Sequence, residues 1–137
     1  MRDNMNLLLG VSGEFYALRQ FEALGYKVEY AQAKKQGDLK VVDMTTGQIV
    51  KVEIKTARKG RNLNYQICLK KKGKTDVAHS DLVVIQLVLG TGEVVPFFIP
   101  APLLADKQGI SFTRAQTYNG KWAQYRQADY RIFEGVV

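Results

Sequence analysis

Cysteine and histidine are almost absent from this sequence of 137 residues, which has one of each, Cys68 and His79. Structural zinc sites take four ligands that are mostly cysteine or histidine, and a disulfide needs two cysteines, so the single chain forms neither. Hydrolytic chemistries that depend on several histidines are disfavoured for the same reason. Carboxylates and lysines remain as the candidate catalytic groups.

Long hydrophobic runs and linkers are also missing. The longest early apolar stretch, residues 7–11, is shorter than the roughly 20 residues of a membrane-spanning helix and than a typical signal-peptide core. The three prolines all lie between residues 96 and 102, and no repeat or low-complexity tract interrupts the chain. We therefore expect an intracellular protein with no membrane association, made of a single domain over residues 1–137.

Positive charge is plentiful: 20 Lys and Arg against 13 Asp and Glu give a formal net charge of +7. Such an excess favours a polyanionic partner, because neutralised phosphates release condensed counterions, and it makes nucleic acid the first partner to test. Residues 51–74 are especially basic, with Glu53 as their one acid. We interpret this segment and the earlier lysine pair as a DNA-binding track: Lys34, Lys35, Arg58, Lys59, Arg61, Lys70, Lys71, Lys72 and Lys74.

The periodicity of apolar residues predicts an opening helix over residues 12–24. Phe15, Leu18, Phe21 and Leu24 recur at helical spacing, with Ser12 as the expected amino-terminal cap and a glycine after the last residue.

The remaining pattern predicts strands and one further helix. A hairpin is expected around the glycine-containing turn at 45–47, and residues 81–89 are apolar enough for a strand buried on both faces. The expected elements are strands at 26–30, 38–43, 48–56, 63–69, 81–89 and 93–99 and a short helix near 121–128. Together they indicate the α/β class, with a mixed central sheet of about five strands flanked by helices.

The candidate chemistry centres on the expected strand 48–56. Strand alternation sends Glu53 and Lys55 to the same face, so that a carboxylate lies beside an ammonium. A carboxylate can hold Mg²⁺ while a neighbouring lysine orients or activates water, which suits phosphodiester hydrolysis. Asp38, at hairpin distance, supplies a second carboxylate. Glu14, expected in the first helical turn near the positive helix end, supplies a third.

These residues resemble the PD-(D/E)XK nuclease superfamily, in the form Glu14, then Gly37-Asp38, then Glu53-Ile54-Lys55, although the proline of the name is absent. Over residues 10–58 the chain is most similar to archaeal-type Holliday junction resolvases. Phe97-Phe98-Ile99-Pro100 is instead similar to superfamily members among restriction and homing endonucleases.

The resemblance implies a restriction-endonuclease-like fold and a role for each residue. Asp38, Glu53 and the Ile54 carbonyl bind Mg²⁺, or Mn²⁺ in its place, Lys55 supports the attacking water, and Glu14 completes the site directly or through water. It also implies a homodimer that cleaves four-way DNA junctions during DNA recombination and repair.

Three alternatives stay open: a sequence-specific homing or restriction-type endonuclease, a non-catalytic DNA-binding module on the same fold, and an RNA-processing enzyme. The intact set of acids and lysine argues against the second. We assign no chemistry to Cys68, expected to be a small packing residue, or to His79, and we expect the carboxy-terminal aromatic residues to serve core or dimer packing.

Overall fold

A mixed five-stranded sheet forms the centre of the molecule. The computed structural model describes residues 2–31, 38–58, 64–71, 74–75, 79–113 and 120–133. The strand order is β1-β2-β3-β7-β8, with β3 and β7 parallel and the other neighbours antiparallel. The strands of this sheet are β1 (Lys27–Tyr30), β2 (Leu39–Val42), β3 (Ile49–Arg58), β7 (Leu82–Val88) and β8 (Val94–Pro100). The expected α/β class and mixed sheet are confirmed.

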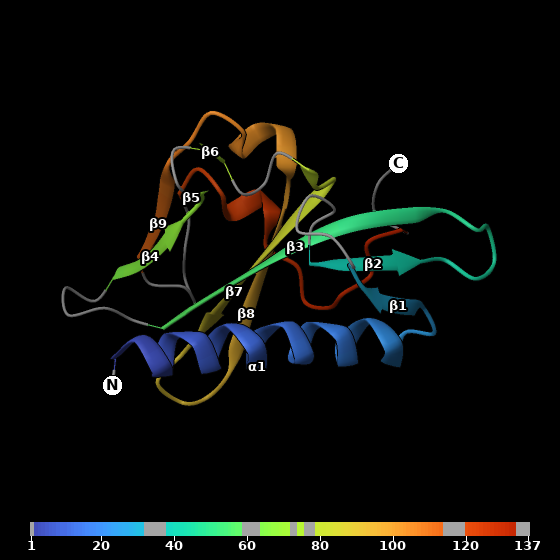
Figure 1. Cartoon of the computed structure of the whole chain (residues 1–137), viewed down its shortest axis with the longest axis horizontal. Coiled ribbons are helices and arrows are strands. Elements are labelled where there is room, and N and C mark those ends of the chain that lie inside the picture. The colour runs from blue at the N-terminus through green and yellow to red at the C-terminus, as the bar shows by residue number, and fades with distance from the viewer. Residues whose placement is uncertain are drawn as a thin grey trace.

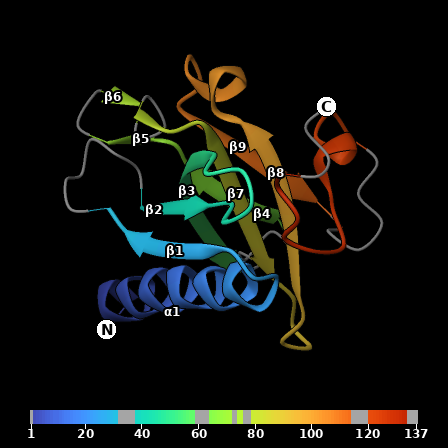
Figure 2. The ribbon, with the colours of Figure 1, turned by 90° about the vertical axis from the view of Figure 1, so that its right-hand side faces the viewer.

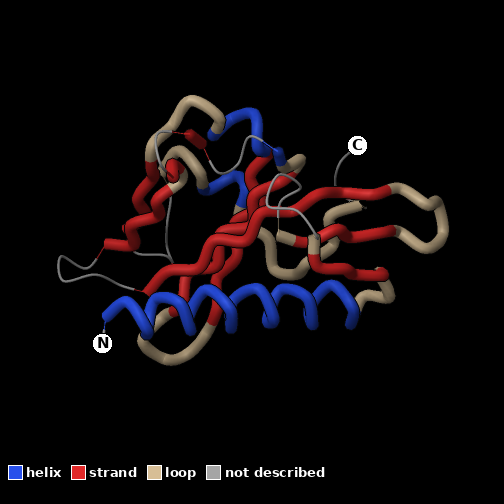
Figure 3. Tube along the Cα trace, viewed as in Figure 1, coloured by secondary structure: helices blue, strands red, loops and turns tan. Residues whose placement is uncertain are grey.

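Different elements cover the two faces of the sheet. Helix α1 (Arg2–Ala23) runs along one face, and the opposite face carries two-stranded pairs and short 3-10 turns (Figure 1, with the same layers seen from the side in Figure 2). Figure 3 shows how little of the described chain is helical beyond α1. The elements of the second face are β4 (Asn64–Cys68) with β9 (Gly109–Thr113), β5 (Lys70–Lys71) with β6 (Lys74–Thr75), and the turns η3 (Ala101–Leu104) and η5 (Ala123–Tyr125).

The opening helix differs from the prediction in its start and in one residue of its buried face, Phe15, whereas Phe21, Leu18 and Leu24 pack against the core as predicted. It begins at Arg2, so Ser12 lies inside the helix and is no cap. The buried face is Gly13, Ala17 and Phe21, spaced four apart, whereas Phe15 is 55% exposed. Small residues occupy this face because the helix lies close to β3, as the contact at Gly13 described below shows.

Each face of the sheet has its own hydrophobic core. On the helix side, Ala17 and Phe21 pack with Val52, Ile54 and other residues of the sheet. On the opposite side, Ala57, Val83 and Ile85 pack against β4, β9 and the two 3-10 turns. Residues 83–87 are buried throughout, which confirms the strand predicted to be covered on both faces.

The carboxy-terminal region departs from the predicted helix near 121–128. Only residues 123–125 are helical there, as the 3-10 turn η5, and its aromatic neighbours pack into the core instead. Trp122 and Tyr130 are buried, on opposite sides of the sheet. The expected core packing is therefore confirmed for them. Cys68, by contrast, is exposed on β4, where the alternate residues Tyr65 and Ile67 are buried, and its predicted packing role is wrong.

None of the helices in the described part of the chain combines the length and apolar character needed to cross a membrane.

Candidate active site

The β2–β3 hairpin carries two of the predicted acids, Asp38 and Glu53, to the end of its ladder. Its ladder runs from Val42–Ile49 to Leu39–Val52, so Asp38 and Glu53 come one step beyond its last pair. The Asp38 backbone N–H still donates to the Val52 carbonyl at 3.0 Å. Val52 is also the partner of Leu39, so the regular register of the hairpin ends at Asp38.

Asp38 is held at this point by the backbone of β3. Its Oδ2 accepts a hydrogen bond from the Ile54 N–H at 2.8 Å. In a strand the N–H and C=O of one residue point toward the same neighbour, so the Ile54 carbonyl also faces the β2 side. Asp38 and the Ile54 carbonyl therefore lie on the same side of β3.

Glu53 and Lys55 form a largely buried pair. Lys55 Nζ lies 3.7 Å from Glu53 Oε1, and the two side chains are 19% and 10% exposed. A second lysine and glutamate with the same spacing occur on the edge strand β1, where Lys27 Nζ lies 3.3 Å from Glu29 Oε1 at 59% and 51% exposure. The Glu53–Lys55 pair differs from the Lys27–Glu29 pair in its burial. Burial matters for function, since a desolvated charge interacts far more strongly with a bound ion or phosphate than an exposed one does.

Glu14 reaches the site from the middle of α1. Because the helix starts at Arg2, this residue is not in the first turn, and the favourable helix-end position predicted for it is wrong. Burial, followed by the nearby charge of Asp38, raises the pKa of the Glu14 carboxyl above its ordinary value. The electrostatic influence of Asp38 requires the two carboxylates to lie near one another.

The helix is fixed against the sheet by a buried polar network that the sequence pattern did not predict. The Gln86 amide on β7 donates to the Gly13 carbonyl at 2.9 Å and to Thr56 Oγ1 at 3.1 Å. Its oxygen accepts from the Tyr130 hydroxyl at 2.7 Å. Burial raises the pKa of the Tyr130 hydroxyl, which keeps it protonated as a donor.

This network adjoins the site on both sides. Gly13 precedes Glu14, and Thr56 follows Lys55. A Cβ added to Gly13 would collide with Thr56 Oγ1 and lie 2.8 Å from Thr56 Cβ. Gln86 had a signal in the sequence, since it is the one polar residue of the apolar run 82–89, and a buried amide needs hydrogen-bond partners.

The predicted DNA-binding residues are placed only in part. Arg58 ends β3 and is exposed. Lys70, Lys71 and Lys74 belong to the short strands β5 and β6 on the face opposite α1. Lys34, Lys35, Lys59, Arg61 and Lys72 lie outside the described residues.

The predicted convergence of three carboxylates is likewise only partial. The charge of Asp38 acts on Glu14, but within the described ranges no three Asp, Glu, His or Cys side chains gather as a group able to hold a metal ion. The geometry provides pairs of acids with a lysine beside them.

Comparison with models of protein families gave no match, and comparison with curated protein sequences gave none either. Among solved structures, the chain is similar to a bacterial homing endonuclease, I-Ssp6803I, with a TM-score of 0.67 and 18% sequence identity over 88% of this chain and 86% of that one. The likeness spans nearly the whole of both chains, and it establishes that this chain has the fold of that endonuclease.

Proposed function

We propose that this protein is a divalent-metal-dependent DNA endonuclease whose site consists of Asp38, Glu53 and Lys55, with Glu14 beside Asp38. The observation that carries the proposal is the largely buried pair on β3, with the Lys55 ammonium 3.7 Å from the Glu53 carboxylate, and Asp38 held against the same strand through the Ile54 N–H. The fold shared with a homing endonuclease supports the same interpretation.

The donor atoms fit a hard divalent cation. Mg²⁺ is usually held by one or two protein carboxylates, with water and substrate phosphate completing its shell, so a two-carboxylate site is sufficient. Asp38, Glu53 and the Ile54 carbonyl would hold the ion, and Mn²⁺ would substitute for Mg²⁺. When bound, such an ion polarises the phosphoryl group and lowers the pKa of water.

The chain's own residues then have distinct tasks. Lys55 orients the attacking water and offers a positive charge to the phosphate. Asp38 keeps its position through the Ile54 N–H. Glu14, whose pKa is raised, takes up a proton more readily than an exposed glutamate and is suited to accept one from the water.

The homing-type substrate, a specific sequence in duplex DNA, is better supported than the four-way junction, because the structural likeness is to a homing endonuclease. A homodimer would provide the two sites, related by a two-fold axis, that cutting both strands requires.

The test separates cleavage from binding. Glu53→Ala, Asp38→Asn and Lys55→Ala should each lower the single-turnover cleavage rate in Mg²⁺ or Mn²⁺ by a factor of about 10² to 10⁴. Binding measured in Ca²⁺ should stay intact, or become slightly tighter for Glu53→Ala, which removes a charge that repels phosphate.

Glu29→Ala and Lys27→Ala are matched controls, since they remove an exposed pair of the same spacing. The substrates would be a library of duplex sequences, four-way junctions, single-stranded DNA and RNA. The nuclease proposal fails if the unmodified protein cleaves none of these substrates, or if the Glu53 and Lys55 variants cleave as fast as the unmodified protein. A non-catalytic DNA-binding module would then be the better explanation.

A further inference from the structure

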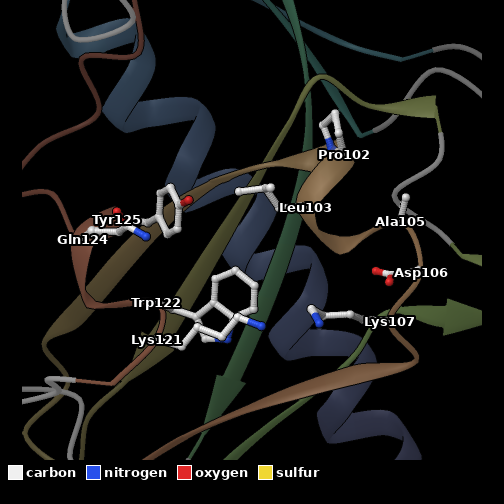
Figure 4. A pocket seen from close by; sticks show the side chains of 9 residues that line it. All are labelled: Pro102, Leu103, Ala105, Asp106, Lys107, Lys121, Trp122, Gln124 and Tyr125. Carbon is white, nitrogen blue, oxygen red and sulfur yellow. The ribbon is translucent and has the colours of Figure 1, made fainter.

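A pocket of about 440 Å³ lies between η3 and η5, apart from the candidate active site. Figure 4 shows the rings of Trp122 and Tyr125 and the side chains of Lys107 and Leu103 around it. Ligand sites commonly have volumes of roughly 300 to 1,000 Å³, so this space is large enough for a small organic group.

The chemistry of the lining is aromatic and cationic. Lys121 Nζ lies 5.0 Å and Lys107 Nζ 5.9 Å from the centroid of the Trp122 ring. The rings of Trp122 and Tyr125 are 6.0 Å apart, centroid to centroid. Asp106 is the one acid of the lining, against two lysines. Trp122 is only 7% exposed, so the half-buried Tyr125 offers the more accessible ring. This ring and the two ammonium groups line one pocket, and together they complement a ligand that has both a flat ring and a negative charge.

The pocket lies on the same side of the sheet as Glu53 and Lys55. Trp122 belongs to the core cluster that includes Ala57, and Ala57 shares its face of β3 with both residues of the pair. Along the sheet, Glu53 pairs with Val83 and Val83 with Ile99, two residues before η3. Two strand spacings, about 10 Å, therefore separate Glu53 from Ile99, and the chain continues from Ile99 into the turn that lines the pocket.

We propose that this pocket binds one unpaired nucleotide of a DNA strand, with the base against Tyr125 and the phosphate between Lys107 and Lys121. The proposal rests on the proposed function, because it takes DNA as the ligand that reaches this face. Stacking on an aromatic wall tolerates any base, so the pocket contributes affinity for distorted or single-stranded DNA and not sequence preference.

Trp122 is the only tryptophan of the chain, so its fluorescence reports on the pocket alone. The full chain would be titrated in Ca²⁺ with an eight-nucleotide oligothymidylate, with the corresponding duplex, with thymidine monophosphate and with inorganic phosphate. We expect the single strand to quench the Trp122 emission more than the duplex, and the monophosphate to quench it more weakly than the oligonucleotide. Inorganic phosphate should have little effect, since it lacks a base.

Variants identify the groups that touch the nucleotide. Tyr125→Ala should weaken oligonucleotide binding about tenfold, as expected when one stacked ring is removed. The double variant Lys107→Gln with Lys121→Gln should also weaken binding and lower the salt slope by about 0.7 for each phosphate that is no longer neutralised. The matched control, Lys27→Gln with Arg131→Gln, removes two exposed cations outside the pocket and should have a smaller effect on the quenching.

Unchanged Trp122 emission when fluorescence anisotropy shows the oligonucleotide bound would overturn the proposal, as would equal effects of the pocket variant and its control. Emission that depends on protein concentration without DNA would assign the pocket to a second copy of the chain. Glu53→Ala should keep the whole response, so a failure of the nuclease proposal is seen in the cleavage assay and a failure of the pocket proposal in the fluorescence.

Discussion

The two faces of the central sheet are built from the same strands but by different means. On β7, Gln86 points to the helix side and bonds to three other segments, whereas Ile85 and Leu87 point to the other side and make only apolar contacts. On β3, Thr56 faces the helix while Glu53 and Lys55 face away. The helix side of the sheet is therefore held by hydrogen bonds with defined directions, whereas the opposite side is held by apolar packing.

The difference teaches how a helix can be placed accurately beside the strand that carries the candidate site. Apolar packing resists loss of area but allows small shifts at little cost, whereas a buried amide with defined partners accepts few positions. The polar face therefore fixes Glu14 relative to the strand that bears Glu53 and Lys55. The apolar packing lies on the other side of the sheet, together with the Glu53–Lys55 pair and the pocket.

The largest effect on stability should come from removing the centre of the network. Gln86→Leu keeps the size of the side chain but leaves the buried Gly13 carbonyl and Tyr130 hydroxyl without their partner, so the free energy of unfolding should fall by about 3 kcal/mol. Ile85→Val, on the neighbouring position of the other face, should cost about 1 kcal/mol. Denaturant unfolding measures both. If the two variants lose equal stability, the distinction between the faces has no energetic basis.

A smaller effect is expected from closing the gap between helix and strand. In an isolated helix, Gly→Ala stabilises by about 1 kcal/mol. At Gly13, however, the added methyl group collides with Thr56, so Gly13→Ala should lower the free energy of unfolding by about 2 kcal/mol. The substitution should also slow cleavage, because it displaces Glu14. Adding Thr56→Gly should remove the collision, and a double-mutant cycle should show a favourable coupling of about 1 kcal/mol or more. Purely additive effects would argue against the close contact.

The smallest effect should be a pH-dependent one at Glu14. Its pKa is raised, so the folded state favours the protonated carboxyl, and the ionised carboxylate costs stability at pH above that pKa. Glu14→Gln should therefore raise the melting temperature at neutral pH, and the gain should shrink as the pH falls toward the ordinary value of 4.5. Glu22→Gln, an exposed position on the same helix, is the control. A gain that is constant with pH would contradict the raised pKa.

The strands were predictable because their patterns depend on local sequence. Alternation in residues 48–56 and the apolar run 81–89 located β3 and β7, and the glycine at the tight turn located the hairpin, where Gly47 has a φ of 76°. The side-by-side placement of Glu53 and Lys55 followed from the same alternation. The roles of these residues in catalysis remain predictions.

What the sequence did not reveal depends on contacts between distant segments. Of the predicted helix face, Phe21, Leu18 and Leu24 pack against the core, but Phe15 is exposed, because the close approach of β3 favours Gly13 and Ala17 at the buried positions. The helix predicted near 121–128 was too long, since only residues 123–125 are helical. Trp122 is buried by packing against the sheet, which does not require a longer helix. The pocket beside Trp122 combines residues from two separate turns, which no local pattern links.

The hydrogen bonds of Gln86 also bear on how the protein opens. They join residue 13 of the amino-terminal helix, residue 56 of the central strand and residue 130 of the carboxy-terminal segment. Neither end segment can detach without depriving Gln86 of a partner, so the two should behave as one cooperative unit in native-state hydrogen exchange. Amides of α1 near Gly13 and those around Tyr130 should therefore share one opening free energy, although more than a hundred positions separate them in the chain.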